Sequence, residues 1–125
     1  MANATPTRFE KATDTELAWA AGFFDGEGCT TAVSRAPSGG FRFQSQVCQV
    51  ELAVLERFKT AVGVGRIYGP YSRPNRQDHY RFQTASFEDT QAMIALLWKW
   101  LSEPKRQQAK RVLLKVLAFY KESKL

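Results

Sequence analysis

The sequence predicts an α+β domain in which pairs of antiparallel strands alternate with helices that cover one face of a four-stranded sheet. Three observations predict it: capping residues with helical apolar spacing, alternating polar and apolar residues, and turn-rich segments between strand pairs. With 125 residues, 44% of them hydrophobic, the chain can bury the core of one domain. The expected order is α-β-β-α-β-β-α-α, over a single domain at 13–125 preceded by a flexible arm at 1–12.

The first helix is expected to begin after Thr13, because Thr13 and Glu16 have the spacing of a capping box. Residues 17–24 are apolar on every side of this helix, so more than one surface must bury it. Gly22 costs about 1 kcal/mol relative to alanine there, which makes sense where another backbone comes close. Residues 25–28, Asp-Gly-Glu-Gly, should end the helix.

The remaining elements follow from turn signals and spacing. Strands are predicted at 29–35 and 41–50, followed by a helix at 51–62. A second strand pair is predicted at 65–71 and 79–85, around the loop 72–78. Two helices, at about 88–100 and 105–121, complete the chain, with Pro104 separating them.

The charge distribution favours binding of a polyanion. The formal net charge is +6, yet the first 28 residues hold five acidic and only two basic side chains. A basic protein with carboxylates gathered near one end suggests polyanion binding combined with chemistry that needs carboxylates, although a merely solvated basic surface is the alternative. No apolar run could cross a membrane and no signal peptide is visible. We therefore expect an intracellular protein, in bacterial or phage cytoplasm or an organelle, without a membrane partner or small-molecule substrate.

One face of the predicted sheet has the composition of a surface that reads DNA. Residues 29–50 and 65–83 together contain six arginines, no lysine and one acid. Arginine and glutamine offer forked hydrogen bonding that matches guanine and adenine edges, whereas an ordinary polar face would carry more Lys, Glu and Thr. The expected DNA-contacting residues are Thr31, Arg35, Arg42, Gln44, Gln46, Arg66, Tyr68, Arg73, Arg76, His79, Arg81 and Gln83.

Glu27 is the candidate metal ligand. It lies between two glycines at the C-terminal end of the first helix, where the helix dipole is unfavourable for a carboxylate. A bound divalent cation would offset this, and Mg²⁺ suits hard oxygen ligands such as Glu27 and the carbonyl of Gly26, with Mn²⁺ as a further option. Acids and glycines are also common at ordinary helix ends.

Residues 20–28, AAGFFDGEG, resemble the LAGLIDADG motif of homing endonucleases. Phenylalanines occupy the two large apolar positions of the motif, and Glu27 replaces its second aspartate. The residues identical to the motif are Ala21, Gly22, Asp25 and Gly28. Segments 46–49, 63–68 and 105–109 also look similar to the family, so the resemblance covers most of the chain.

The resemblance implies an αββαββα fold with a saddle-shaped sheet, extended here by a C-terminal helix, and a metal-dependent nuclease that cuts both strands of a long DNA site. The family needs two motif helices packed around a two-fold axis. Because this chain has one, the resemblance implies a homodimer on a near-palindromic target. The expected interface residues are Trp19, Ala21, Gly22 and Phe23.

The resemblance also implies catalytic roles for three residues. Glu27 would hold the metal ion at the scissile phosphate, Gln49 would position water, and Lys105 would steady developing negative charge. For Gln49 the alternative is a strand-end residue bonded to the backbone, and for Lys105 it is a surface lysine. Asp25 is expected to support the helix junction.

Functions of different classes stay open at this point. The first is a sequence-specific endonuclease. The second is an RNA-splicing maturase or DNA-binding regulator on the same scaffold, with little or no cleavage, and an unrelated small α+β enzyme is the third. Glu27 favours the endonuclease, because a protein that only binds phosphates gains nothing from a carboxylate beside them.

Overall fold

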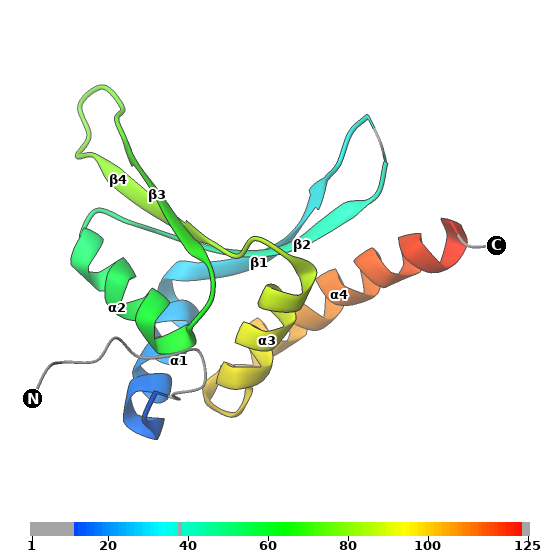
Figure 1. Ribbon diagram of the computed structural model, residues 1–125, viewed down its shortest axis with the longest axis horizontal. Helices are drawn as coiled ribbons and strands as arrows, with labels where there is room; N and C mark the ends of the chain where they lie inside the picture. Colours follow the sequence, from blue (N-terminus) through cyan, green and yellow to red (C-terminus); the bar gives the residue numbers. More distant parts are fainter. Residues whose placement is uncertain (1–11, 38, 124–125) are drawn as a thin grey trace, which may run out of the picture.

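The computed structural model describes residues 12–37 and 39–123 and confirms the α+β architecture, with the order αββαββα and an additional C-terminal helix (Figure 1). A short 3₁₀ turn at Trp98–Trp100 joins the last two helices. The elements are α1 (Asp14–Glu27), β1 (Gly28–Ser34), β2 (Phe41–Gln49), α2 (Leu52–Val62), β3 (Arg66–Tyr71), β4 (His79–Gln83), α3 (Phe87–Leu97) and α4 (Glu103–Ser123). Of the predicted arm at 1–12, all but Ala12 lies outside the described residues.

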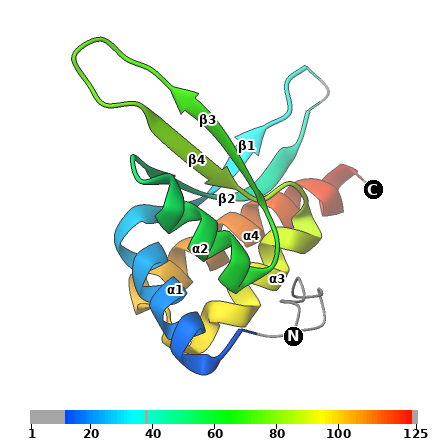
Figure 2. The same cartoon turned by 60° about the vertical axis from the view of Figure 1, so that its left-hand side comes forward.

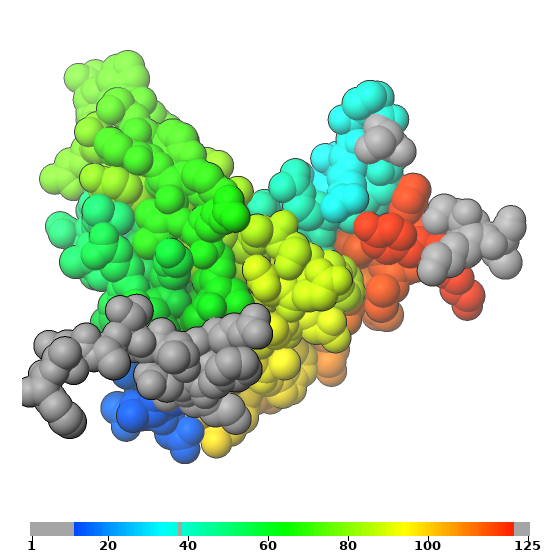
Figure 3. Space-filling model, in the orientation of Figure 1, coloured from blue at the N-terminus to red at the C-terminus, as the bar shows by residue number. Residues whose placement is uncertain are grey.

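The four strands form one antiparallel sheet in the order β1-β2-β4-β3. The β1–β2 pair runs from Gly28 opposite Val47 to Ser34 opposite Phe41. The central pair is much shorter, because β2 and β4 are in register only over 46–49 and 80–83. Beyond it the two hairpins diverge (Figure 1), and the space-filling view in Figure 3 shows a hollow between them.

The helices cover one face of this sheet and enclose the core (Figure 2). The largest fully buried side chains include Phe24 of α1, Phe58 of α2 and Phe82 of β4. The Phe58 and Phe82 rings meet edge to face at 5.0 Å, a favourable aromatic arrangement. The core therefore lies between the sheet and the helix layer and leaves the opposite face of the sheet free of helices.

Buried hydroxyl groups fix the strands relative to α3. Thr30 Oγ1 and Ser45 Oγ share a hydrogen bond of 2.8 Å between β1 and β2. Thr84 Oγ1 accepts from the Ser45 amide at 3.0 Å and shares a 2.6 Å hydrogen bond with Thr90 Oγ1 of α3. Since these residues are buried, their mutual hydrogen bonds satisfy groups that would otherwise destabilise the fold.

Element ends differ from the sequence-based prediction where side chains cap or turn the backbone. The last strand ends at Gln83 rather than residue 85, because Thr84 joins the hydroxyl network. Pro104 does not separate two helices but lies in the first turn of α4, where its missing N–H costs nothing. In the described part of the chain, no helix combines the length and apolarity needed to cross a membrane.

Candidate functional site

Glu27 is the last residue of α1 and its side chain is exposed. It forms no ion pair or hydrogen bond with any other described residue. The chain passes directly from Glu27 into β1 through Gly28, whose N–H donates to the Phe24 carbonyl. A Cβ at Gly28 would lie 2.3 Å from the Phe24 ring, so only glycine permits this close junction of helix and strand. The junction holds the Glu27 backbone rigidly while its carboxylate stays available.

The carbonyl of Gly26 is a second candidate oxygen ligand. The last carbonyls of a helix lack intrahelical partners. If the helix continued, the Gly26 carbonyl would accept from the amide of Thr30, four residues later. That amide donates to Gln108 Oε1 at 2.9 Å instead. Nowhere among the described residues do three or more His, Cys, Asp or Glu side chains form a group that could hold a metal. The donors fit a hard cation such as Mg²⁺, which takes few protein ligands and keeps others from water or phosphate.

Asp25 is saturated by structural contacts. Both of its carboxylate oxygens accept from the Ser102 amide at 3.1 Å, and Ser102 Oγ donates to Oδ1 at 3.1 Å. Ser102 immediately precedes α4, so Asp25 fastens the end of α1 to the start of α4. The expectation that Asp25 supports a helix junction is confirmed.

Of the other two catalytic candidates, the structure brings only Lys105 to the α1–β1 junction. Lys105 lies in the first turn of α4, half-buried, and its Nζ donates to the Gly28 carbonyl. Gln49 ends β2, and its Oε1 accepts from the Val50 amide at 2.8 Å. No described contact joins Gln49 to Glu27 or Lys105, and its oxygen behaves as the backbone-bonding alternative expects.

Most of the predicted DNA-contacting residues share one face of the sheet. Gln46 on β2 lies opposite Gln83 on β4, which lies opposite Arg66 on β3, and Tyr68 lies opposite Arg81 in the same way. Directly opposed residues point to the same face. We call this the open face, because no helix covers it in Figures 1 and 2. It carries Thr31, Arg42, Gln44, Gln46, Arg66, Tyr68, Arg81 and Gln83.

Gln44 does not fulfil the role expected of it. Its side chain is buried, with 6% of the residue exposed, and its Nε2 donates to the Thr84 carbonyl at 3.4 Å. Thr84 draws the amide into the polar network between strands. The expectation of an exposed, base-reading Gln44 is therefore wrong for the free chain.

The remaining predicted contacts lie at the hairpin ends. Arg35 directly follows β1, Arg73 and Arg76 are exposed in the β3–β4 loop, and His79 begins β4. A cavity of about 540 Å³ lies between the β3–β4 loop, the start of β4 and the end of β2, and we call it the hairpin groove. Its lining residues are Cys48, Val50, Arg73, Arg76, Gln77, His79 and Arg81.

Tyr71 belongs to this region and was missed by the sequence-based prediction. A register shift in β3 between Tyr68 and Tyr71 places Tyr71 opposite His79, with the two rings 5.4 Å apart. The guanidinium of Arg81 lies 5.3 Å from the Tyr71 ring. Strict alternation from Tyr68 would put Tyr71 on the covered face. Gly69 and Pro70 were the available signal, because glycine and proline within a strand often mark a bulge.

The open face is positively charged without internal compensation. The ion pairs found among the described residues are Arg57–Glu16 and Arg106–Glu103, and both lie in the helix layer. Arg57, hydrogen-bonded to Glu16, holds the pKa of that carboxyl below its ordinary value. No acid of the described residues forms an ion pair with Arg66 or Arg81, which leaves their charge for an external anion.

The predicted dimer face of α1 is narrower than the sequence suggested. Ala21 is fully buried in the core of the single chain, so its assignment to the interface is wrong. Trp19 and Phe23 stack at 5.5 Å and turn toward α2, where Phe23 meets Phe58 and Trp19 lies under the Arg57 guanidinium. Gly22 is exposed, and a Cβ there would meet nothing within 4 Å. Gly22 therefore remains open to a second copy.

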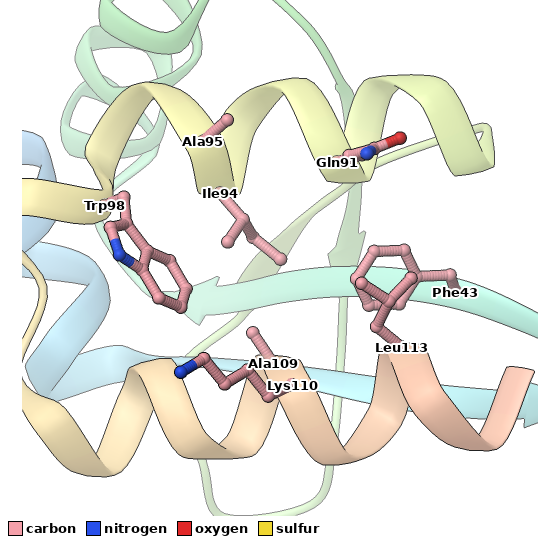
Figure 4. A pocket seen from close by; sticks show the side chains of 8 residues that line it. All are labelled: Phe43, Gln91, Ile94, Ala95, Trp98, Ala109, Lys110 and Leu113. Carbon is pink, nitrogen blue, oxygen red and sulfur yellow. The ribbon is translucent and has the colours of Figure 1, made fainter. Parts of the chain in front are cut away.

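A separate, apolar cavity of about 460 Å³ lies in the helix layer between α3 and α4, over Phe43 of β2 (Figure 4). Ile94 of α3 and Trp98 of the 3₁₀ turn face Ala109 and Leu113 of α4 across it. Ala95 also lines the cavity, and Lys110 and Gln91 supply its polar groups. Its position behind the sheet separates it from the open face.

Comparison with solved structures places the fold. The homing endonuclease I-CvuI in complex with its target in the presence of calcium is 28% identical, with a TM-score of 0.65, covering 79% of this chain and 64% of that one. The LAGLIDADG meganuclease I-AabMI bound to uncleaved DNA is 19% identical, with a TM-score of 0.65, covering 86% and 38%. The chain has the LAGLIDADG homing endonuclease fold. In this fold, the motif-like residues 20–28 are the second half of α1 and its junction with β1.

The LAGLIDADG likeness extends to an archaeal intron-encoded homing endonuclease, I-Vdi141I, complexed with DNA. It is 24% identical, with a TM-score of 0.63, covering 75% of this chain and 62% of that one. This protein spans 64% of the length of I-CvuI. A second I-CvuI structure holds the I-CreI target, not cleaved, in the presence of magnesium. No protein-family model and no curated protein sequence matches this chain.

Proposed function

We propose that this protein is a metal-dependent DNA endonuclease that acts as a homodimer on a long, near-palindromic site. The observation that carries the proposal is Glu27: an exposed carboxylate that has no partner among residues 12–37 and 39–123, at the end of the motif helix of a chain whose open face is basic. The arginines of the open face favour a polyanion, so an unneutralised acid at the junction of α1 with the sheet needs a reason. A divalent cation shared with a phosphate supplies one.

The described residues divide the work as follows. Glu27 and the Gly26 carbonyl would hold the ion, which when bound would polarise the phosphate and stabilise the leaving oxygen. Lys105, tethered to the Gly28 carbonyl, would present its ammonium group to the charge that develops at the phosphate. Gln49 keeps its Nε2 free to orient water, since only its oxygen is engaged by the backbone.

A homodimer would give each DNA strand its own copy of this site. Gly22 carries the prediction, because it is exposed in the middle of α1 with open space where a side chain would be. Gly22→Leu should yield a monomer in sedimentation velocity while the unsubstituted protein sediments as a dimer. Ala18→Ser, a smaller change on the same helix, is the control and should leave the dimer intact. A monomeric unsubstituted protein would contradict this part of the proposal.

The activity can be tested without knowing the target. The protein is incubated with a pool of duplexes carrying randomised palindromic sites, with Mg²⁺ or with EDTA, and cut ends are captured and sequenced. We expect one family of sites cut on both strands with Mg²⁺, and no cut ends with EDTA. Enrichment of bound but uncut sites under both conditions would instead indicate a binding protein, and enrichment of no sequence at all would contradict DNA recognition.

A further inference from the structure

The hairpin groove differs chemically from the rest of the open face. Three of its lining residues are arginines, and no carboxylate of the described part of the chain lines it. The acid of this hairpin, Asp78, accepts a hydrogen bond from Ser72 Oγ at 2.7 Å and so is engaged within the loop. Apolar surface is also present, because Val50 is 42% exposed and Cys48 is exposed beside it. The groove therefore offers donors and an apolar wall together, but no acceptor charge.

Arg81 is the best-fixed of these donors. It lies in the middle of the sheet, opposite Cys48 on β2 and Tyr68 on β3, so strands on both sides hold its backbone. No described residue accepts a hydrogen bond from its guanidinium, and its Nε is buried without a partner. Arg73 and Arg76, by contrast, are exposed in a loop. An arginine that is rigid and lacks an internal acceptor is suited to a planar acceptor pair that comes from outside.

Tyr71 restricts the position of the Arg81 side chain. Its ring lies 5.3 Å from the Arg81 guanidinium and 5.4 Å from the His79 ring, so it contacts both neighbours on β4. The register shift after Tyr68 is what turns Tyr71 to this side. Because Tyr71 is itself 39% exposed, its contribution to the core is small. Its contacts serve mainly to hold the two β4 side chains.

Resting on the proposed DNA-binding function, we infer that the hairpin groove is a subsite for one guanine of each half-site. Arg81 reads the guanine through its O6 and N7 acceptors, which is the planar pair that a rigid arginine fits. Tyr71 is the positioning residue that keeps Arg81 in that geometry. The two loop arginines, Arg73 and Arg76, contact the backbone phosphates that flank the guanine.

The test uses full-length protein carrying Glu27→Gln, so that bound DNA stays intact, and the randomised duplex pool. Bound sequences are counted for five proteins: this background alone and with Arg81→Ala, Tyr71→Ala, Tyr71→Phe or Arg42→Ala. We expect a guanine enriched at one position of each half-site, with its preference reduced about fivefold to 150-fold by Arg81→Ala. Tyr71→Ala should reduce the same preference, and Tyr71→Phe should restore it, since the ring contact is kept.

Arg42→Ala is the matched control, because Arg42 is an arginine of the open face on the other hairpin. It should leave the guanine position unchanged. If the background protein enriches no DNA, the proposed function fails. If it enriches sites but Arg81→Ala lowers affinity equally for all of them, Arg81 contacts phosphate and the inference is overturned. The positioning role of Tyr71 would be overturned if Tyr71→Phe and Tyr71→Ala reduced the guanine preference equally. This comparison requires that both variants have the same unfolding temperature as the background protein.

Discussion

The helix layer and the open face treat their charged groups in opposite ways. In the helix layer, Arg57 makes a two-pronged contact with Glu16, at 3.1 and 2.5 Å, and Asp25 is bonded to Ser102. On the open face, Arg66 and Arg81 have no acid partner among the described residues, and at the edge between the two layers Glu27 has no partner either. The contrast teaches that charge left uncompensated in a folded chain marks the surface where a ligand supplies the opposite charge.

The largest expected difference separates two glutamates of the same helix. Glu27→Gln should abolish cleavage and spare DNA affinity, because it removes a metal ligand but also an anion beside phosphates. Glu16→Gln, at the other end of α1, should leave cleavage unchanged. Single-turnover cleavage and filter binding on a selected site measure both effects. A large loss of affinity with Glu27→Gln would count against its role as a metal ligand.

Substitution of one arginine in each region should give a difference of intermediate size in DNA binding. Arg42→Ala, on the open face, should weaken DNA binding by about 1–3 kcal/mol if it reads a base. Arg57→Ala, in the helix layer, should leave binding unchanged and lower only the stability of the fold. Titrations across a range of salt concentrations distinguish the two. If Arg42 contacts phosphate instead, its loss should weaken all sequences alike and reduce the salt slope by about one.

Asp25 provides a prediction about stability alone. Asp25→Ala removes the acceptor for the Ser102 amide and hydroxyl, so it should lower the free energy of unfolding by about 1 kcal/mol, as loss of a helix cap does. Urea unfolding monitored by circular dichroism gives this value. Asp14→Ala, an exposed acid at the opposite end of α1, is the matched control and should cost less. A loss no larger than that of the control would mean that the tie between α1 and α4 adds nothing.

The smallest expected effect is the pH dependence of the Glu16–Arg57 pair. Arg57 lowers the pKa of Glu16 below its ordinary value of 4.5, so the stabilisation is fully present above that value and is lost as the pH falls through the lowered pKa. The pair is exposed, so the effect is small. Unfolding of the unsubstituted protein and Glu16→Gln should therefore differ slightly at neutral pH and converge in acid. A difference that persists in acid would assign the effect to packing.

Local patterns in the sequence were sufficient for most of the architecture. Thr13 caps α1 as its spacing predicts, with its Oγ1 accepting from the Glu16 amide at 3.2 Å. Alternation placed Arg42, Gln46 and Arg81 on one face, because side chains of a strand have a period of two. The position of Glu27 at the end of α1 could also be predicted from the sequence, because the glycines on both sides of it mark a helix end.

The errors about Ala21 and Gln44 depended on information that local patterns do not contain, whereas Tyr71 was missed although the glycine and the proline within β3 signalled a bulge. α1 is apolar on every side, so its sequence does not say which side faces the core, and Ala21 was assigned to the wrong one. A bulge in β3 reverses the face of Tyr71. Gln44 is buried and donates a hydrogen bond to the carbonyl of Thr84, a residue forty positions away.

The short pairing of β2 with β4 has a practical consequence. The strand pairing between the two halves of the sheet covers 46–49 and 80–83, and the hydrogen bonds of Thr84 with Ser45 extend it by one residue. Each hairpin beyond this narrow waist is therefore close to a self-contained module. Replacing the tip of one hairpin should therefore disturb the other very little. A protein engineer could diversify the two hairpin tips in separate libraries and combine the selected variants, while the waist and its buried hydroxyl groups are kept constant.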